Sequence, residues 1–344
     1  MQKKIRVAIL VIAAIILYNC LPQVEQILRV CTRTGFYKVI VQTTPTILTL
    51  PQTTVFAKPK AEAYNENRKR LEEYEDRRQH ILSVCGNSKK LKATDKVLDN
   101  LLVDPKHKVV LCDIPKVVST NWRRLFLIFA GLNESIARTA FFYDINEKLS
   151  NKYLKFLKSF NESERETIMT DYFKFMFVRD PLDRLFSAYK DRFVLTHSRA
   201  YRVIGPEIIK MFRPKDIKLY GKNLSKGVTF EEFLKYILTL KKLDTFNMHW
   251  KPYHTYCSPC GVSYDFIGKQ ETMIEDVQYI LDEIGESNVT FPSSSHFKTS
   301  KTATKYKTKE QYLSSVSLET LNKIFKLYDR DYDLFGYSQT LLHA

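Results

Sequence analysis

Two short segments of the chain combine cationic and hydroxyl side chains where a strand is expected to end and a helix to begin. Lys116, Ser119 and Thr120 belong to the first segment, and Arg179 and Ser187 to the second. Helix N-termini attract anions, and arginine offers a bidentate fork to a phosphate. A positioned lysine can also stabilise charge on a leaving group. The pattern predicts two anion-binding turns, although the first turn by itself is equally typical of a simple helix cap.

Residues 172–193 contain the elements that must position Arg179 and Ser187. Tyr172–Val178 is a nearly continuous apolar and aromatic run, typical of a strand buried on both faces of a parallel sheet. Asp180 and Pro181 suit the N-cap and first position of a helix. One helix face is then apolar, at Leu182, Leu185, Phe186, Tyr189 and Phe193. The opposite face is expected to present Arg184, Ser187 and Asp191.

Residues 108–129 repeat this plan around Lys116. Val109–Cys112 predicts a short buried strand, and Ile114 and Pro115 end it. A helix follows, with apolar positions at Trp122, Leu125, Phe126 and Phe129. The pattern GxxxxGK[ST] is absent from the chain and this turn has no glycine, so the usual ATPase loop is not expected. Strands that alternate with helices predict an α/β body with a central parallel sheet and ligands at the strand C-terminal ends.

Charge and the N-terminal residues predict an exported protein with a polyanionic partner. The chain has 344 residues and a formal net charge of +16. A positively charged tail at residues 1–6 precedes an apolar run at residues 7–22, short for a bilayer span of about 20 residues but typical of a signal segment. Because no small-residue cleavage site follows, an uncleaved anchor is favoured over a removed signal peptide.

The next region is expected to be a lumenal stem at residues 23–80, followed by a folded body at residues 81–344. Residues 43–54 are rich in Thr and Pro and suit an extended spacer. Residues 58–78 are highly charged and favour a solvated helix. The alternative is a coiled coil between subunits, which would make a homodimer through the stem.

Sequons and cysteines agree with export. The four N-glycosylation sequons begin at Asn133, Asn161, Asn223 and Asn288. An oxidising lumen would allow the six cysteines to form disulfides. Cys257 and Cys260 without a second CxxC make a poor zinc site, so a local disulfide or two buried thiols are expected. In the lumen, nucleic acid is not expected as the polyanion.

Several blocks of residues in the expected folded body resemble those of one protein family. Pro115–Arg123 resembles the 5′-phosphosulfate loop of Golgi membrane-anchored carbohydrate sulfotransferases, in the branch of the HNK-1 and chondroitin/dermatan 4-O-sulfotransferases. Val178–Tyr189 is similar to the 3′-phosphate site of that family. Further blocks follow in the family order, so the resemblance covers residues 81–338: His249–Tyr253, Cys257–Cys260, Tyr264–Glu271 and Tyr328–Tyr337.

The resemblance implies a P-loop-like sulfotransferase fold and a single-pass type II protein of the Golgi membrane with its catalytic domain in the lumen. It implies 3′-phosphoadenosine 5′-phosphosulfate as sulfonate donor, with no metal expected. Lys116 would be catalytic and Arg179 and Ser187 would bind the 3′-phosphate. The 5′-phosphosulfate would be bound by Lys116, Val117, Ser119, Thr120, Asn121 and Trp122.

A general base and an acceptor surface are less well defined by the residues. A sugar hydroxyl must lose its proton on transfer. His249 is the preferred base because it lies in a family-like block, although a packed or supporting role is equally consistent with its position. His254, Asp113 and Asp180 are weaker candidates. Basic residues that could line an acceptor groove are Arg123, Arg124, Lys190, Arg192, Lys251, Lys298 and Lys301.

Three functions are therefore considered. The first is sulfonate transfer to a glycan hydroxyl, with the 4-hydroxyl of N-acetylgalactosamine in chondroitin or dermatan favoured and a glucuronic-acid-terminated glycoprotein glycan as the alternative acceptor. The second is a kinase-like phosphoryl transfer, for which a glycine-rich loop is missing. The third is glycosaminoglycan binding without catalysis, which leaves Lys116 and Arg179 unexplained.

Overall fold

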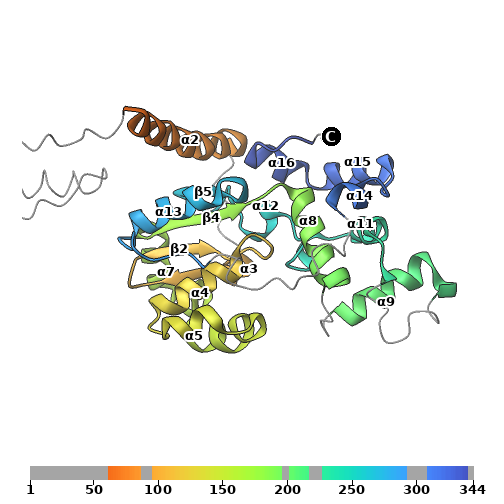
Figure 1. Cartoon of the computed structure of the whole chain (residues 1–344), viewed down its shortest axis with the longest axis horizontal. Helices are drawn as coiled ribbons and strands as arrows, with labels where there is room; N and C mark the ends of the chain where they lie inside the picture. Colours follow the sequence, from red (N-terminus) through yellow and green to blue (C-terminus); the bar gives the residue numbers. More distant parts are fainter. Residues whose placement is uncertain (1–60, 87–94, 196–200, 217–226, 293–307, 340–344) are drawn as a thin grey trace, which may run out of the picture. The chain divides into compact units, whose positions relative to one another are not determined.

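The computed structural model describes residues 61–86, 95–195, 201–216, 227–292 and 308–339 (Figure 1). The expected tail, the anchor at residues 7–22 and residues 23–60 of the stem lie outside these ranges. Within them, no helix has both the length and the apolar character needed to cross a membrane. Of the sequon asparagines, Asn133, Asn161 and Asn288 are exposed, and Asn223 is outside the described ranges.

The core of the molecule is a five-stranded sheet in the order β3-β1-β2-β4-β5. Its strands are β1 (Leu101–Asp104), β2 (Val109–Cys112), β3 (Lys155–Phe156), β4 (Phe173–Val178) and β5 (Phe266–Lys269). β2, β4 and β5 are parallel, whereas β1 is antiparallel to both of its neighbours. The expected central parallel sheet is therefore present in β2, β4 and β5, but the sheet as a whole is mixed because β1 is antiparallel. The short 105–108 turn between β1 and β2 explains this, because adjacent parallel strands need a longer crossover.

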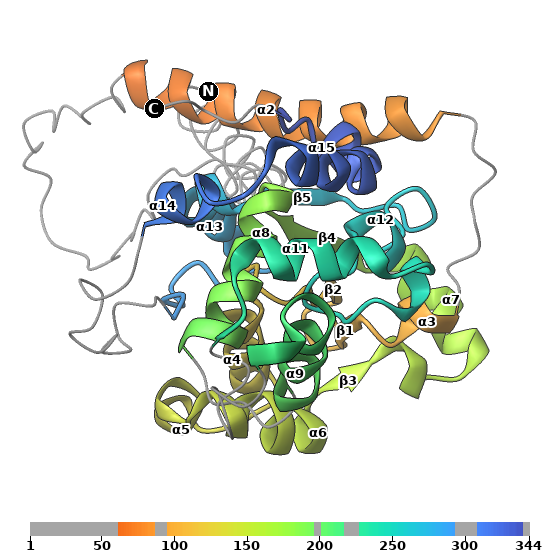
Figure 2. The same ribbon diagram turned by 90° about the vertical axis from the view of Figure 1, so that its right-hand side faces the viewer.

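The helices and helical turns of the described ranges have the following bounds: α2 (Ala61–Cys85), α3 (Asp95–Leu98), α4 (Ser119–Phe129), α5 (Glu134–Thr139), η1 (Asp144–Leu149), α6 (Ser150–Tyr153), η2 (Leu157–Ser159), α7 (Glu162–Asp171), α8 (Pro181–Tyr189), η3 (Lys190–Leu195), α9 (Tyr201–Phe212), η4 (Pro214–Asp216), α11 (Phe230–Thr239), η6 (Leu243–Thr245), α12 (Tyr253–Tyr256), η7 (Gln270–Thr272), α13 (Met273–Glu283), α14 (Lys309–Leu313), α15 (Leu318–Leu327) and α16 (Asp329–Phe335). Figures 1 and 2 show α2 and α13 near the β5 edge of the sheet, and α4 and α5 displaced from them along the strand order, below β2.

Two hydrophobic clusters hold these elements together. The larger cluster surrounds the sheet, and the second is formed by α8, α9, α11 and α15. The predicted stripe of α8 lies in the second cluster, where Leu185, Tyr189 and Phe193 are buried. Within the sheet, Gly268 of β5 pairs with Phe177 of β4, and a Cβ at Gly268 would lie 2.4 Å from the Phe177 ring. A glycine is therefore required there by close packing between the strands.

Helix α2 belongs to the folded body, which corrects the expected boundary between residues 80 and 81. Tyr74 is buried against Phe266 of β5 and Tyr279 of α13, with ring centroids 4.9 Å from each. Arg77 donates to the fully buried Asp276 carboxylate at 2.6 Å. The charged segment 58–78 is thus not a fully solvated helix over its described part, because one of its faces covers the body. A homodimer through the stem stays a prediction.

Two disulfides join distant parts of the chain and correct the expected local pair. Cys112 at the end of β2 is bonded to Cys257, and Cys85 at the end of α2 is bonded to Cys260. Cys257 and Cys260 are therefore neither bonded to each other nor free thiols. Spacing along the chain suggested a local bond, but tertiary folding brings one partner of each pair from elsewhere. The loop between them is fastened to both β2 and α2.

Candidate active site

A large cavity lies where the parallel strands β2, β4 and β5 end, and it has a volume of about 1140 Å³. It collects predicted polar site residues from both turns: Lys116, Ser119, Thr120 and Asn121 from the first, and Arg179 and Ser187 from the second. His249 and Arg192 also line it. Residues that are far apart in the sequence meet here because the C-terminal ends of neighbouring parallel strands share one edge of the sheet.

The turn before α4 is built without glycine but uses two left-handed residues. Lys116 has φ of 73° and Val118 has φ of 48°, and Val118 is the N-cap of α4. A β-branched residue rarely adopts this conformation, which stores on the order of 1–3 kcal/mol of strain. Helix α4 begins at Ser119, so Ser119 and Thr120 belong to its first turn rather than to a loop. Their backbone N–H groups therefore lie at a helix N-terminus, where an anion is stabilised.

Two of the predicted donor-binding side chains point into the core instead. Val117 is 2% exposed and Trp122 is 1% exposed, and neither lines the cavity. Trp122 packs against the rings of Phe175, Phe177 and Phe291. Their side chains thus hold the turn against the sheet, and direct contact of either side chain with a bound nucleotide is not supported.

Lys116 is held inside the cavity by Asp191 of η3, a residue that helical spacing predicts only to lie on the polar face after Arg179. Its Nζ is 2.9 Å from Oδ2 of Asp191, which also lies 3.1 Å from Nε of Arg192. Burial lowers the pKa of the Lys116 ammonium, and the Asp191 carboxylate opposes this shift. The lysine is therefore paired and aimed before any substrate is present.

The second turn is positioned by α8 and by a buried tyrosine. Asp180 caps α8 by accepting from the Asp183 N–H at 2.9 Å, with Pro181 in the first turn, as predicted. The Tyr253 hydroxyl accepts from the Arg179 N–H at 3.2 Å and donates to the Arg179 carbonyl at 3.1 Å. The Arg179 guanidinium lies 3.6 Å from the Asp183 carboxylate. The backbone at Arg179 is thus fixed on both sides while its side chain faces the cavity.

His249 lies in the cavity with both ring nitrogens engaged. Oδ1 of Asn247 accepts from the His249 backbone N–H at 3.0 Å and lies 2.8 Å from Nδ1 of the ring, so Nδ1 carries the proton. The lone pair of Nε2 faces a guanidinium nitrogen of Arg192. Burial, followed by the charges of Arg192 and Lys116, lowers the pKa of His249 to about 2. His249 is therefore neutral, and Arg192 occupies the lone pair that a base would use.

The other three candidates for the general base differ in whether they line the cavity. Asp113 lines the cavity, and its Oδ2 accepts from Arg123 at 2.7 Å. Its Oδ1 is buried without a hydrogen-bond partner among the described residues. His254 and Asp180 do not line the cavity. His254 is bonded to Asp331, and Asp180 caps α8, so both have structural roles in the present arrangement.

Arg184 holds parts of the site together, and the helical pattern predicted its position wrongly. It was expected on the polar face of its helix but is only 2% exposed. Its guanidinium donates to the carbonyls of Pro115, Lys251 and Met248 at 3.2, 2.7 and 3.0 Å. It also stacks on the Tyr253 ring at 4.5 Å. Arg184 therefore connects the residue before Lys116 with the segment around His249, a role that only three-dimensional contacts can identify.

Gln270 was also missed, although a sequence signal for it existed. It directly follows β5 and lines the cavity, and its Oε1 is buried without a hydrogen-bond partner among the described residues. Because β5 is parallel to β4, the residue after β5 reaches the same edge as Arg179. The rule that ligands bind at strand C-terminal ends would have selected this position.

The predicted basic groove is only partly present. Arg123 and Arg192 line the cavity. Arg124 is 2% exposed and donates to the carbonyls of Ala137 and Ala140. Lys190 and Lys251 do not line the cavity, and Lys298 and Lys301 lie outside the described ranges. In the described part of the chain, no group of three or more His, Cys, Asp or Glu side chains is arranged to hold a metal ion.

Comparison with known proteins gives a consistent family match. Residues 99–338 match the sulfotransferase family. Carbohydrate sulfotransferase 9 of Homo sapiens is 33% identical over 283 residues, which cover 81% of this chain and 63% of that protein. Carbohydrate sulfotransferase 14 of Danio rerio is 34% identical over 278 residues, covering 76% of this chain and 71% of the relative. Carbohydrate sulfotransferase 11 of Mus musculus is 31% identical over 273 residues, which cover 76% of this chain and 75% of that relative.

The chain thus spans less than two thirds of the human relative but more than two thirds of the other two. No solved structure matches the chain. The family match covers both anion-binding turns and confirms the resemblance based on their residues, and it does not favour the kinase-like alternative. With Lys116, Arg179 and Ser187 gathered in one cavity within the matched region, the chain belongs to the sulfotransferase family of enzymes, among relatives that are carbohydrate sulfotransferases.

Proposed function

We propose that this protein transfers a sulfonate group from 3′-phosphoadenosine 5′-phosphosulfate to a hydroxyl of a glycan. The observation that carries the proposal is the meeting of two anion-binding turns in one cavity, at the ends of the adjacent parallel strands β2 and β4. A donor with phosphates at both its 5′ and 3′ positions needs two such turns. The volume of about 1140 Å³ leaves room for an acceptor beside the nucleotide.

In this proposal the first turn holds the reacting end of the donor. The N-terminus of α4, with the Ser119 and Thr120 hydroxyls, faces the 5′-phosphosulfate. Arg179 and Ser187 hold the 3′-phosphate, to which arginine contributes a charged fork and serine a single donor. Gln270, with its buried unpaired oxygen, lies on the same side as Arg179 and can contact the nucleoside.

The reaction exchanges one sulfur–oxygen bond for another. The acceptor hydroxyl oxygen bonds to sulfur while the bond from sulfur to the 5′-phosphate oxygen breaks, so negative charge gathers on the departing phosphate. Lys116 supplies the positive charge there, and its pairing with Asp191 holds the ammonium in the cavity beforehand. The lowered pKa of Lys116 also makes this group a better proton donor to the leaving oxygen.

Two groups of the cavity can accept the proton of the acceptor hydroxyl. His249 can do so only after Arg192 releases Nε2. Asp113 has a buried oxygen without a hydrogen-bond partner among the described residues, and Arg123 binds its other oxygen. One variant tests each candidate. His249→Gln removes a base that must first be uncovered, whereas Asp113→Asn keeps the shape of the side chain and removes the carboxylate charge that pairs with Arg123.

The acceptor and the cellular location belong to the proposal as well. The net charge of +16 favours an acidic glycan, and the family resemblance favours chondroitin or dermatan with transfer to the 4-hydroxyl of N-acetylgalactosamine. A glucuronic-acid-terminated glycoprotein glycan is the alternative acceptor. We place the protein in the Golgi membrane with its body in the lumen, on the basis of the apolar run at residues 7–22 and the sequons.

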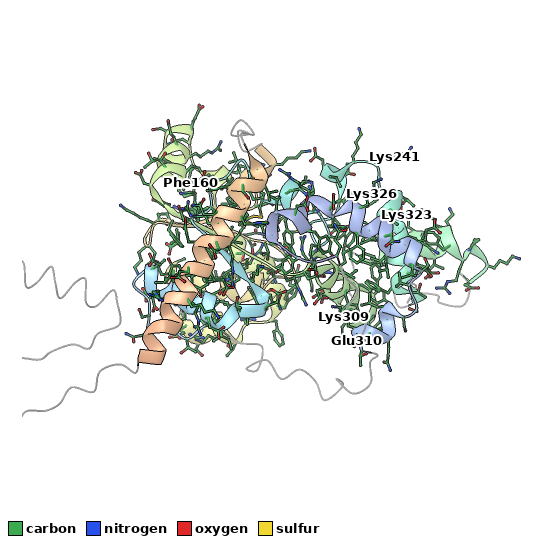
Figure 3. All side chains as sticks on the ribbon, turned by 90° about the horizontal axis from the view of Figure 1, so that it is seen from above. Phe160, Lys241, Lys309, Glu310, Lys323 and Lys326 are labelled. Atoms are coloured by element: carbon green, nitrogen blue, oxygen red, sulfur yellow. A yellow bond between two sulfur atoms is a disulfide. The ribbon has the colours of Figure 1, made fainter. Side chains whose placement is uncertain are left out.

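Transfer of labelled sulfate from the donor to a panel of desulfated glycans tests the proposal. Lys116→Ala should lower kcat about 10²–10³-fold, because a charge that stabilises the leaving group is lost. Its affinity for adenosine 3′,5′-bisphosphate should fall as well, because the 5′-phosphate of this leaving group loses the same positive charge. Lys323→Ala is the matched control, because Lys323 is an exposed lysine of α15 that does not line the cavity (Figure 3). Absence of transfer to every glycan by folded wild-type protein would contradict the proposal.

A further inference from the structure

We propose that Phe142 and Tyr143 form a stacking platform for an uncharged pyranose ring of the acceptor glycan, an inference that rests on the proposed function. Phe142 is 55% exposed and Tyr143 is 64% exposed, yet both line the cavity. Large apolar side chains exposed together at the mouth of a cavity commonly mark a binding surface. An aromatic ring offers a flat apolar face, and tyrosine adds a hydroxyl that can bond at its edge.

The platform is held beside the first turn by the element that follows it. It directly precedes η1, and Arg123 of α4 donates to the Asn146 carbonyl of η1 at 3.0 Å. Arg123 is in turn fixed by Asp113, the residue after β2. The platform is therefore attached to the β2 and α4 side of the cavity. Figures 1 and 2 agree with this, because α4 and α5 lie below β2 and are displaced along the strand order from β5 and α13.

The strand order separates this platform from the expected place of the nucleoside. β4 lies between β2 and β5, so Arg179 and Gln270 are displaced from Lys116 toward β5. A donor that extends from Lys116 to Arg179 runs away from the α4 side. The aromatic pair remains on the other side of the reacting centre, where the acceptor must approach the sulfonate. The adenine base is thus the less favoured occupant.

The surrounding charges indicate which part of a glycan fits. Glu147 is exposed, lines the cavity and follows the platform within η1, together with Asn146. The Lys148 ammonium lies 5.9 Å from the centroid of the Tyr143 ring, but it is paired with Asp144 at 2.9 Å and does not line the cavity. A carboxylate repels a uronate or a sulfated ring but accepts hydrogen bonds from sugar hydroxyls. The C–H face of an uncharged ring can lie on Phe142 and Tyr143 while its hydroxyls reach these polar groups.

Single and double alanine variants test the platform by separating acceptor from donor kinetics. Phe142→Ala and Tyr143→Ala together should raise the acceptor KM about ten-fold, the effect of losing one good contact surface. The donor KM and the Tm should stay at wild-type values, because both side chains are exposed. Phe141→Ala is the matched control, since Phe141 is an adjacent aromatic residue, 81% exposed, that does not line the cavity. Equal effects in Phe141→Ala and the double variant would overturn the assignment, and so would a rise in donor KM alone, which would point to adenine.

A binding measurement distinguishes failure of the platform from failure of the proposed function. Saturation-transfer NMR is recorded with a desulfated chondroitin hexasaccharide while the aromatic protons of the protein are irradiated. Transfer to the ring protons should be seen with wild type and with Lys116→Ala, and should be several-fold weaker in the double variant at the same glycan concentration. This result would support the platform even if sulfate transfer were absent. Unchanged saturation in the double variant, or no saturation with wild type, would overturn it.

Discussion

At the scale of single residues, the active site is a chain of charged and polar contacts across the cavity. Lys116 is paired with Asp191, Asp191 also contacts Arg192, and Arg192 contacts His249. Asn247 fixes the opposite side of the imidazole. Each member is held by its neighbour rather than by bulk water. The positions of Lys116 and His249 are consequently linked, although they are far apart in the sequence.

The protonation state of His249 gives a testable consequence of this chain of contacts. Its pKa falls from 6.5 to about 2 on folding, so between these pH values the unfolded state binds more protons. The contribution of this residue to the free energy of unfolding is therefore complete above pH 6.5. It decreases as pH falls, by up to about 1.4 kcal/mol per pH unit. Denaturant unfolding of wild type and His249→Gln between pH 7.5 and 4.5 should show a shallower decline in the variant. An NMR titration of His249 with a midpoint near 6.5 would contradict the buried, neutral state.

Arg179 and Ser187 should affect donor binding more than chemistry. In the proposed arrangement they hold the end of the donor that does not react. Arg179→Ala should raise the donor KM about ten- to a hundred-fold, and Ser187→Ala less, because a charged fork is replaced in one case and a single hydroxyl in the other. Initial rates over a donor titration, at saturating acceptor, measure both constants. A large fall in kcat with an unchanged donor KM would place Arg179 at the reacting centre instead.

At the scale of elements, the buried Arg184 connects segments that are far apart in the sequence. Arg184 of α8 binds carbonyls on both sides of the cavity, at Pro115 and at Met248 and Lys251. The disulfide between Cys112 and Cys257 joins the same regions, from the end of β2 to the end of α12. The strained turn at Lys116 and Val118 is thus held by surrounding elements rather than by its own residue types.

Replacing Arg184 should weaken both the fold and the site. Arg184→Met leaves three carbonyl acceptors without their donor and should lower the free energy of unfolding by about 2–5 kcal/mol. Where the variant is still folded, kcat should fall because the residue before Lys116 loses its anchor. Arg124→Met is the matched control, because Arg124 is equally buried but caps α5 through backbone carbonyls. Denaturant unfolding and steady-state rates measure the two effects. Equal falls in kcat for both variants would contradict a specific role for Arg184.

At the scale of the whole molecule, α2 completes the body by covering β5 and α13. Tyr74 packs on their aromatic residues, and Arg77 is the partner of the fully buried Asp276. Cys85 then joins the end of α2 to Cys260. Removing this helix would expose an aromatic surface and leave a buried carboxylate without its cation.

A comparison of two shortened chains tests this boundary. A protein that begins at residue 81 keeps Cys85 but lacks Tyr74 and Arg77, and it should be less stable by about 3–5 kcal/mol than one that begins at residue 61, because Asp276 stays buried and unpaired. It should also aggregate more through the uncovered surface. Thermal unfolding and size-exclusion chromatography compare the two proteins. The substitution Tyr74→Ala in the longer protein removes only part of the packing between α2 and the body, so its loss of stability should be smaller. Equal Tm values would show that α2 is not part of the body.

Local residue patterns are enough to predict the strand, turn and helix units around Lys116 and Arg179 and the buried stripe of residues 182–193. These features depend on residue type and spacing over a few positions, which apolar periodicity and capping preferences reveal directly. Contacts in the folded protein set the antiparallel pairing of β1, the disulfide partners, the packing of α2 and the inward position of Arg184. They also placed Arg192 on His249 and turned Val117 and Trp122 into the core. These outcomes depend on contacts between residues far apart in the chain, and helical or strand periodicity contains no information about which distant group will satisfy a buried charge or thiol.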